Sequence, residues 1–439
     1  MKTLYPKNTG MQVFTLIWFG QMISLIGSQL SNFALGIWVY QKTGSVTQFA
    51  LLSLFSSLPM ILISPIAGTL VDRFPRRWVM LLSDFGAGIA TTVIAILFSS
   101  GDLTIWHICV GMMLSSCCTA FQWPAYTSAT TFLVPKEHLS RANGMLQMGE
   151  AAGRLVSPIL GGFLLLLIEI DAILYIDVVS FLVALLILIL APFPKQYIDR
   201  HRAEPLPWLT ETFYGLVYIF KRKGLFALLI FFGITNFLVG IVQMLVTPLV
   251  LSFGSPTDLG TIMTIGGVGM LISSILISTM KGPQKRIYSI FGFMLLGGIC
   301  ITCAGFYKSV PLLALIAFLF FFGQPIINSS TLVIFQKKVP SNVQGRVFAT
   351  IGAIANASLP LAYAAAGPLA DKIFEPLMSK NGLLASNVGK IIGVGQGRGI
   401  GLMFIVMGLL TVLATIIAYR YKPLRLLEKQ LPDIVSNSN

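Results

Sequence analysis

The sequence predicts an all-α membrane protein, because of its composition, the length of its apolar runs and the placement of its basic residues. Hydrophobic residues make up 55% of the 439-residue chain and charged residues 10%, against roughly 45–50% and 25% in soluble domains. The apolar runs approach the ~20 residues that a helix needs to cross a bilayer, and they lack the alternation of a membrane β-barrel. Helices are therefore the expected spanning elements.

Twelve apolar runs are the candidate transmembrane helices. They lie near residues 13–38, 46–70, 78–99, 105–133, 143–168, 172–193, 225–252, 259–280, 288–307, 312–335, 347–370 and 399–419. The first run follows Lys2 and Lys7, as in a signal peptide. It exceeds the roughly 7–15 apolar residues of a signal-peptide core, and no small-residue cleavage site follows it. We therefore expect this run to remain as the first helix.

Basic residues alternate between the two sides of this predicted arrangement. One set of loops is rich in Lys and Arg, whereas the opposite loops hold only Lys42, Lys308, Lys372, Lys380, Lys390 and Arg398. Because cytoplasmic loops retain positive charge, both termini are expected in the cytoplasm of a multi-pass protein of the cell (inner) membrane. The net charge of +14 then reflects topology, and its spread over seven short segments argues against a nucleic-acid partner.

The longest cytoplasmic segment divides the predicted helices six and six. We expect an N-terminal half at 1–193, a cytoplasmic linker at 194–224, a C-terminal half at 225–422 and a cytoplasmic tail at 423–439. Within the linker, TETFYGLVYIFKRK at 210–223 has the pattern of an amphipathic helix on the membrane surface. A plain connecting loop is the alternative.

Two matched segments indicate an internal duplication. VPKEHLSR at 134–141 corresponds to VPSNVQGR at 339–346, and each follows a span that carries two polar residues around a proline. These are Gln122 and Tyr126 around Pro124, and Gln324 and Asn328 around Pro325. Duplicated halves that rock about a site at mid-membrane are typical of secondary transporters.

The loop between the second and third predicted helices carries a charged motif. Its residues are Gly68, Leu70, Asp72, Arg73, Arg76 and Arg77. Their spacing resembles the signature loop of the major facilitator superfamily, G-x-L-x-D-R-x-G-R-[RK], with Pro75 in place of the second glycine. The resemblance implies a major facilitator fold and a cytoplasmic latch, to which we also assign Asp84. The alternative is that these charges only fix the topology.

A second motif lies in the fifth predicted helix. Gly144, Gly153, Ser157, Pro158, Gly161 and Gly162 follow the pattern G-x8-G-x3-G-P-x2-G-G, which resembles the antiporter motif of drug-exporting facilitators. The resemblance implies export, with Ser157 replacing one glycine. Small residues allow close helix packing and the proline bends the helix, so we expect a hinge. Close packing without a hinge is the alternative.

The chain as a whole resembles the macrolide-efflux branch of bacterial facilitators. The resemblance is carried by GQMISLIGSQL, FALGIWVYQKTGS, CCTAFQWPAY, LYIDVVSF, KGLFALL and GRVFATIGAIANASLPLAYAAAGPLADKI. It implies a secondary active exporter of a moderate-sized amphiphilic solute, such as a drug, a macrolide-like compound or a siderophore, by alternating access. A lysophospholipid flippase and a receptor or scaffold that does not transport are the alternatives.

Charged residues inside predicted helices are candidates for proton coupling, because each is energetically costly there. Glu150 and Arg154 lie four residues apart, on one face of the fifth helix, and Asp177 lies in the sixth. A carboxylate whose arginine partner moves can bind and release a proton. We therefore expect proton antiport through Glu150, with Arg154 as its partner and Asp177 as the reserve. A permanent structural ion pair is the alternative.

The resemblance implies a substrate cavity lined by the polar faces of the first, fourth, seventh and tenth predicted helices. The candidate lining residues are Gln21, Ser28, Asn32, Gln122, Tyr126, Asn236, Gln243, Gln324 and Asn328. Neutral amides with aromatic neighbours suit an amphiphilic small molecule, although some of these residues could serve only helix packing. There is no Walker A motif or set of metal-ligand spacings, so we expect no enzyme activity, cofactor or metal. We further expect a monomer embedded in the lipid bilayer.

Overall fold

The computed structural model describes residues 7–71, 74–135, 138–193, 217–279, 285–339 and 341–430. Within these ranges nearly all residues are helical, and none forms a β-strand. The chain divides into two compact units. Unit 1 comprises Met1–Gly44 and Leu51–Ala203, and unit 2 comprises Ser45–Ala50 and Glu204–Asn439. The predicted boundaries at 193, 224 and 422 stay predictions.

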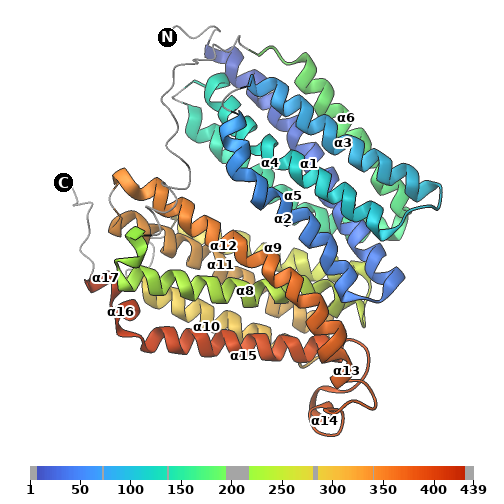
Figure 1. Ribbon diagram of the computed structural model, residues 1–439, viewed down its shortest axis with the longest axis vertical. Helices are drawn as coiled ribbons and strands as arrows, with labels where there is room; N and C mark the ends of the chain where they lie inside the picture. Colours follow the sequence, from blue (N-terminus) through green and yellow to red (C-terminus); the bar gives the residue numbers. More distant parts are fainter. Residues whose placement is uncertain are drawn as a thin grey trace. The chain divides into compact units, whose positions relative to one another are not determined.

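Unit 1 is a bundle of long helices (Figure 1). They are α1 (Lys7–Thr43), α2 (Val46–Val71, whose first residues belong to unit 2), α3 (Arg76–Ser99), α4 (Ile105–Leu133), α5 (Leu139–Leu167) and α6 (Ile170–Leu190). The most extensive contacts join α3 to α4, α1 to α6, α1 to α5 and α3 to α6. Helix α1 therefore lies between α5 and α6, while α3 bridges α4 and α6.

Unit 2 repeats this architecture with short helices added at its ends (Figure 1). Its long helices are α8 (Lys223–Leu251), α9 (Pro256–Thr279), α10 (Arg286–Ala304), α11 (Val310–Lys338), α12 (Ser341–Leu369) and α15 (Arg398–Arg420). The short elements are the π-helical turn η2 (Ala370–Phe374), α13 (Glu375–Leu377), α14 (Gly389–Ile392), α16 (Lys422–Arg425) and α17 (Leu427–Gln430). The largest contacts join α9 to α11, α10 to α11, α10 to α15 and α8 to α12.

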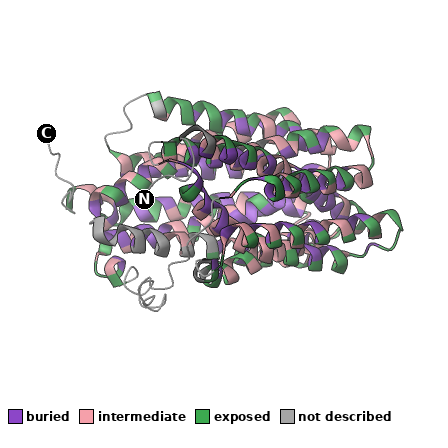
Figure 2. Ribbon diagram, turned by 90° about the horizontal axis from the view of Figure 1, so that it is seen from above, coloured by how far each residue is buried: buried purple, intermediate pink, exposed green. Residues whose placement is uncertain are grey.

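Ten of these helices are long and apolar enough to cross a membrane. The ten are counted over the residues whose side chains the structure describes, and α5 and α12, of 29 residues each, are only partly covered by that count. Large apolar side chains such as Leu82 and Leu190 are exposed along the helices, and exposed stripes run beside buried ones in Figure 2. Lipid rather than water suits such surfaces. The all-α membrane fold is confirmed, while the count of twelve spans and the cytoplasmic termini stay predictions.

The predicted surface helix at 210–223 falls mainly outside the described residues. Residues 194–216 are not described, and the structure shows a helical turn at 217–220 that precedes α8. The two prolines of the internal repeat, Pro124 and Pro325, lie inside α4 and α11. Both fourth helices of the proposed duplication therefore carry an internal proline.

A carboxylate from η2 caps the N-terminus of α2. The Asp371 oxygens accept hydrogen bonds from the backbone N–H groups of Val46 (3.1 Å) and Thr47 (2.8 Å), and from the Ser45 hydroxyl (2.7 Å). Gly367 permits this approach, because a Cβ there would lie 3.0 Å from the Thr47 backbone nitrogen. The cap satisfies donors that a helix start leaves without a partner.

Asp371→Ala is expected to lower the local stability of the first turn of α2 by about 1–2 kcal/mol, the typical value of a lost cap. Hydrogen exchange of the amides at residues 46 and 47 measures this loss, which corresponds to roughly 5- to 30-fold faster exchange. Asp102→Ala, at an exposed aspartate in the turn between α3 and α4, is the control. Unchanged exchange in Asp371→Ala would show that the cap contributes nothing.

Candidate functional site

Three helices of unit 1 bring a carboxylate and two amides together inside the membrane-spanning part of the bundle. The Gln21 amide of α1 donates a hydrogen bond to Asp84 Oδ2 in α3 at 2.8 Å. The Gln122 amide of α4 donates to Asp84 Oδ1 at 2.8 Å and to Gln21 Oε1 at 3.0 Å. Asp84 is only 9% exposed. We call these three residues the Asp84 cluster.

Glycines of α3 allow the neighbouring helices to approach Asp84 closely. A Cβ at Gly86 would lie 2.7 Å from Cys118 Sγ of α4, and a Cβ at Gly88 would overlap the Phe181 ring of α6. Asp84 lies about 12 Å along α3 from its first residue, at 1.5 Å per residue. The local sequence thus buries the carboxylate within the helix bundle, where amide donors replace water as its hydrogen-bonding partners.

Two polar atoms beside the cluster make no hydrogen bond to any described residue. They are Gln122 Oε1 and the hydroxyl of Tyr126, which follows Gln122 by one helical turn and is buried. An unsatisfied buried polar group costs about 1–3 kcal/mol. Such groups often mark a functional site. One acceptor of the cluster and one hydroxyl beside it therefore have no hydrogen-bonding partner among the described residues.

Asp177 of α6 forms a second buried polar site against α1. The Ser28 hydroxyl donates to Asp177 Oδ1 at 3.1 Å, and Asp177 is 2% exposed. Gly27 allows α1 and α6 to approach closely here, because a Cβ at this position would lie only 3.0 Å from Asp177 Oδ1. Asp177 and Ser28, predicted for proton coupling and for the substrate cavity, are thus direct neighbours.

The structure describes only one of the two side chains in the predicted pair of Glu150 and Arg154. Glu150 is half-buried in α5, whereas the side chain of Arg154 lies outside the described residues. A switchable pair and a permanent ion pair both remain predictions.

The structure describes only some residues of the predicted latch. Asp72 and Arg73 lie outside the described part, and Gly68 lies in the last turns of α2. Arg76 Nε donates to the Ser128 hydroxyl at 3.4 Å, and Arg77 Nη2 donates to the carbonyl oxygen of Ile189. Asp84, which we also assigned to the latch, has both carboxylate oxygens hydrogen-bonded by the amides of its cluster. The latch function itself stays a prediction.

Small residues of the α5 motif pack against α1. Ser157 Oγ donates to the Ile26 carbonyl at 3.2 Å, and Cβ atoms at Gly153 and Gly161 would meet Leu25 and Phe33. Pro158 lies within α5, and Gly162 is buried. Gly144 has nothing within 4 Å of a Cβ position. The motif therefore provides close packing along its middle and end, while its hinge role stays a prediction.

The remaining predicted cavity residues do not join a described polar cluster. In unit 2, Asn236 and Gln324 are half-buried, and Gln243 and Asn328 are exposed. Asn32 of α1 is also exposed. The sequence analysis identified Gln21 and Gln122 but not their connection to Asp84. That connection depends on the packing of α1, α3 and α4, which residue spacing does not report.

A sequence model of the Major Facilitator Superfamily matches residues 17–363. The chain belongs to the major facilitator superfamily. Macrolide efflux protein A of Streptococcus pyogenes is 28% identical over 364 residues, which cover 82% of this chain and 90% of the relative. Multidrug efflux pump Tap of Mycolicibacterium fortuitum is 23% identical over 378 residues, which cover 83% and 90%.

Solved structures of other transporters share the fold of this facilitator. A bacterial homolog of the human lysosomal transporter Spinster aligns with a TM-score of 0.71 at 14% identity, covering 98% of this chain and 100% of the other. The nucleoside transporter NupG aligns with a TM-score of 0.68 at 14% identity, covering 94% and 100%. Family and fold confirm a multi-pass membrane transporter of small molecules that is not an enzyme.

Proposed function

We propose that this facilitator exports a moderate-sized amphiphilic solute in exchange for protons, by alternating access in the inner membrane. The observation that carries the proposal is the Asp84 cluster. A carboxylate inside a membrane-spanning helix is costly, and such residues commonly serve proton relays or substrate pathways. Similarity to proteins named as macrolide and multidrug efflux pumps supports the export direction.

The hydrogen-bonding pattern suits a group that gains and loses a proton. Both oxygens of Asp84 accept amide N–H donors, which is the arrangement that an ionised carboxylate requires. After protonation, the new O–H needs an acceptor. Gln122 Oε1, which has no hydrogen bond to a described residue, becomes that acceptor when the amide turns over. One amide rotation thus satisfies the acid in either state.

The same rotation links proton binding to solute binding. When Asp84 is ionised, its carboxylate can also accept a hydrogen bond from a donor group of the solute. When Asp84 is protonated, its O–H is taken up by Gln122 Oε1 and this acceptor for the solute is lost, so proton binding favours solute release and solute binding favours proton release. Neutral donors beside Tyr126 suit a solute that combines an apolar body with a few polar atoms.

Other carboxylates of unit 1 are competing proton carriers within this proposal. Glu150, with Arg154, was the first choice from the sequence, and Asp177 was the reserve. Asp84 is preferred because the described structure shows partners for both of its oxygens. Comparing Asp84→Asn, Glu150→Gln and Asp177→Asn in one transport assay ranks the three.

Solute retention in cells tests the function itself. Cells that lack their own drug exporters are loaded with a macrolide, a fluorescent lipophilic cation or a fluorescent lysophospholipid. We expect the wild-type protein to lower the retained macrolide or cation several-fold, and Asp84→Asn to restore retention. Asp102→Asn, the same change at an exposed site, should behave as wild type.

Two results would contradict the proposed function. Movement of the lysophospholipid alone would indicate a flippase. Unchanged retention of all three compounds, with the protein present in the membrane, would favour a receptor or scaffold.

A further inference from the structure

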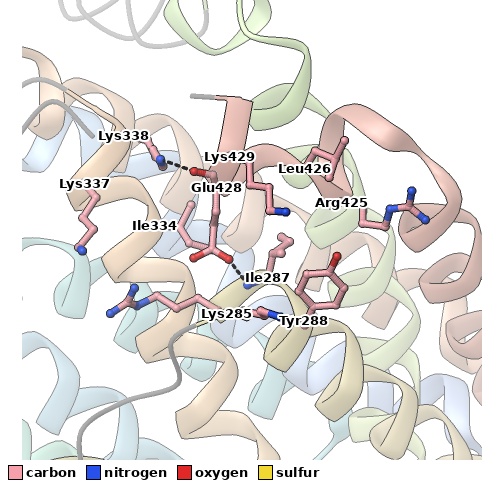
Figure 3. Close-up of a pocket in the computed structure, with 11 residues that line it drawn as sticks. Lys285, Ile287, Tyr288, Ile334, Lys337, Lys338, Arg425, Leu426, Glu428 and Lys429 are labelled. Atoms are coloured by element: carbon pink, nitrogen blue, oxygen red, sulfur yellow. Dashed lines mark hydrogen bonds between the residues drawn. The ribbon is translucent and has the colours of Figure 1, made fainter. Parts of the chain in front are cut away.

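A cavity of about 320 Å3 lies at one end of unit 2, apart from the polar sites described above. Three segments surround it: the start of α10, the end of α11, and the short helices α16 and α17 (Figure 3). Six of the described residues that line it are basic, namely Lys285, Arg286, Lys337, Lys338, Arg425 and Lys429. Glu428 is the one acidic residue among the described residues that line the cavity. We call this cavity the basic end pocket.

Two hydrogen bonds fix the walls of the basic end pocket. Glu428 Oε2 accepts the backbone N–H of Ile287 at 3.1 Å, and Lys338 Nζ donates to the carbonyl oxygen of Glu428 at 2.8 Å (Figure 3). Lys338 is only 4% exposed. Residue 428 therefore ties α17 to both α10 and α11. The pocket is a defined part of the fold and not a chance gap between mobile lysines.

The charge within the pocket is strongly unbalanced. The Glu428 carboxylate already serves as a cap for the α10 N-terminus, where a negative charge is favoured by the helix dipole. Among the described residues that line the pocket, one acid stands beside six basic side chains. Lys337 and Lys338 complement the C-terminal end of α11, but Lys285 and Arg286 stand at a helix start, where positive charge is unfavourable. An anion in the pocket would relieve this repulsion.

The position of the pocket indicates the source of that anion. Candidate membrane spans begin at Arg286 and end at Lys338 beside it. Exposed tyrosines also gather there. Tyr288 contacts Tyr419 with ring centroids 6.1 Å apart, and the Arg425 guanidinium lies 5.5 Å from the Tyr419 ring. Tyrosines at the ends of membrane helices lie at headgroup depth.

We propose that the basic end pocket binds the phosphate of an anionic phospholipid headgroup. Guanidinium and ammonium groups form charge-assisted hydrogen bonds with phosphate oxygens, and basic pockets between membrane helices are suited to acidic lipid headgroups. Topology alone would also place basic residues at these helix ends. It would not require a braced cavity lined by six of them.

Lipid binding to the purified full-length protein tests this proposal. Native mass spectrometry compares retention of phosphatidylglycerol with that of neutral phosphatidylcholine. The pocket variant is Lys285→Gln/Lys429→Gln, at two exposed residues. The control is Arg420→Gln/Lys422→Gln, which removes the same charge from nearby exposed residues outside the pocket lining.

We expect the wild type to prefer phosphatidylglycerol. At about five-fold per basic residue near a membrane surface, the pocket variant should bind it roughly 30-fold more weakly. The control should stay near the wild-type affinity. If the double variant does not fold, the single variant Lys429→Gln should still show about a five-fold loss.

Three outcomes would overturn the proposal. Equal losses in the pocket and control variants would show that only general surface charge matters. Equal retention of both lipids by the wild type would show that the pocket is not a binding site for anionic lipid. A soluble anion would be identified as the ligand if inorganic phosphate, in nanodiscs of pure phosphatidylcholine, raises the melting temperature of the wild type as much as phosphatidylglycerol does in mixed nanodiscs.

Discussion

Asp84→Asn is expected to abolish solute accumulation driven by a pH gradient in inverted vesicles, while solute exchange at equal concentrations continues. Asparagine has nearly the same size and keeps one acceptor oxygen for Gln21 or Gln122, but it cannot carry a proton. Driven accumulation requires net proton movement, whereas exchange does not. The variant should therefore accumulate no more solute than vesicles without the protein.

Two further variants separate the role of Asp84 in coupling from its role in structure. Asp84→Ala leaves both amides without their acceptor, at a cost of about 1–3 kcal/mol for each unsatisfied group, so both driven accumulation and exchange should fall. Asp102→Asn, at an exposed site, should change neither. If Asp84→Asn still accumulates solute while Glu150→Gln does not, the proton carrier is Glu150, as the sequence first indicated.

Gly161→Ala is expected to destabilise the contact between α5 and α1 and to reduce transport. A Cβ at this position would lie 2.5 Å from Cδ1 of Phe33, well inside van der Waals contact, and overpacking of this kind typically costs about 1–3 kcal/mol. Phe33→Leu removes the ring atoms that clash. The double variant Gly161→Ala/Phe33→Leu should therefore regain both thermal stability in detergent and transport.

Gly144→Ala is the matched control within the same motif. Nothing lies within 4 Å of a Cβ at Gly144, and alanine favours a helix over glycine by up to about 1 kcal/mol. This variant should be as stable as the wild type or slightly more so. Equal damage from the two glycine substitutions would contradict an origin in local packing. It would favour a hinge that needs glycine along its whole length.

Bilayer physics explains why the helices could be located from the sequence. A span must be apolar over its whole length, so the runs at 46–70 and 105–133 agree closely with α2 and α4. Helix ends that lie outside the hydrocarbon core of the bilayer need not be apolar, so apolar runs do not locate them. Thus α1 begins at Lys7 and α5 at Leu139, several residues before the apolar runs that predicted them.

The partners of Asp84 show what the sequence could not provide. Asp84 was assigned to the latch from the sequence, and that assignment stays a prediction. Its hydrogen-bonding partners are 63 and 38 residues away, in α1 and α4. The basic end pocket illustrates the same limit, because its lysines and arginines were recognised only as topology signals. Their convergence depends on how α10, α11 and α17 pack.

Proton movement during solute transport is the most direct test of proton-coupled export through Asp84. Purified protein is reconstituted in liposomes that contain a pH-sensitive dye, and a solute gradient is imposed without a pH gradient. For the wild type, solute entry should drive protons out and raise the internal pH, whereas Asp84→Asn should exchange solute with no pH change. Solute entry into wild-type liposomes at constant pH, or an unchanged pH response in Asp84→Asn, would contradict the account.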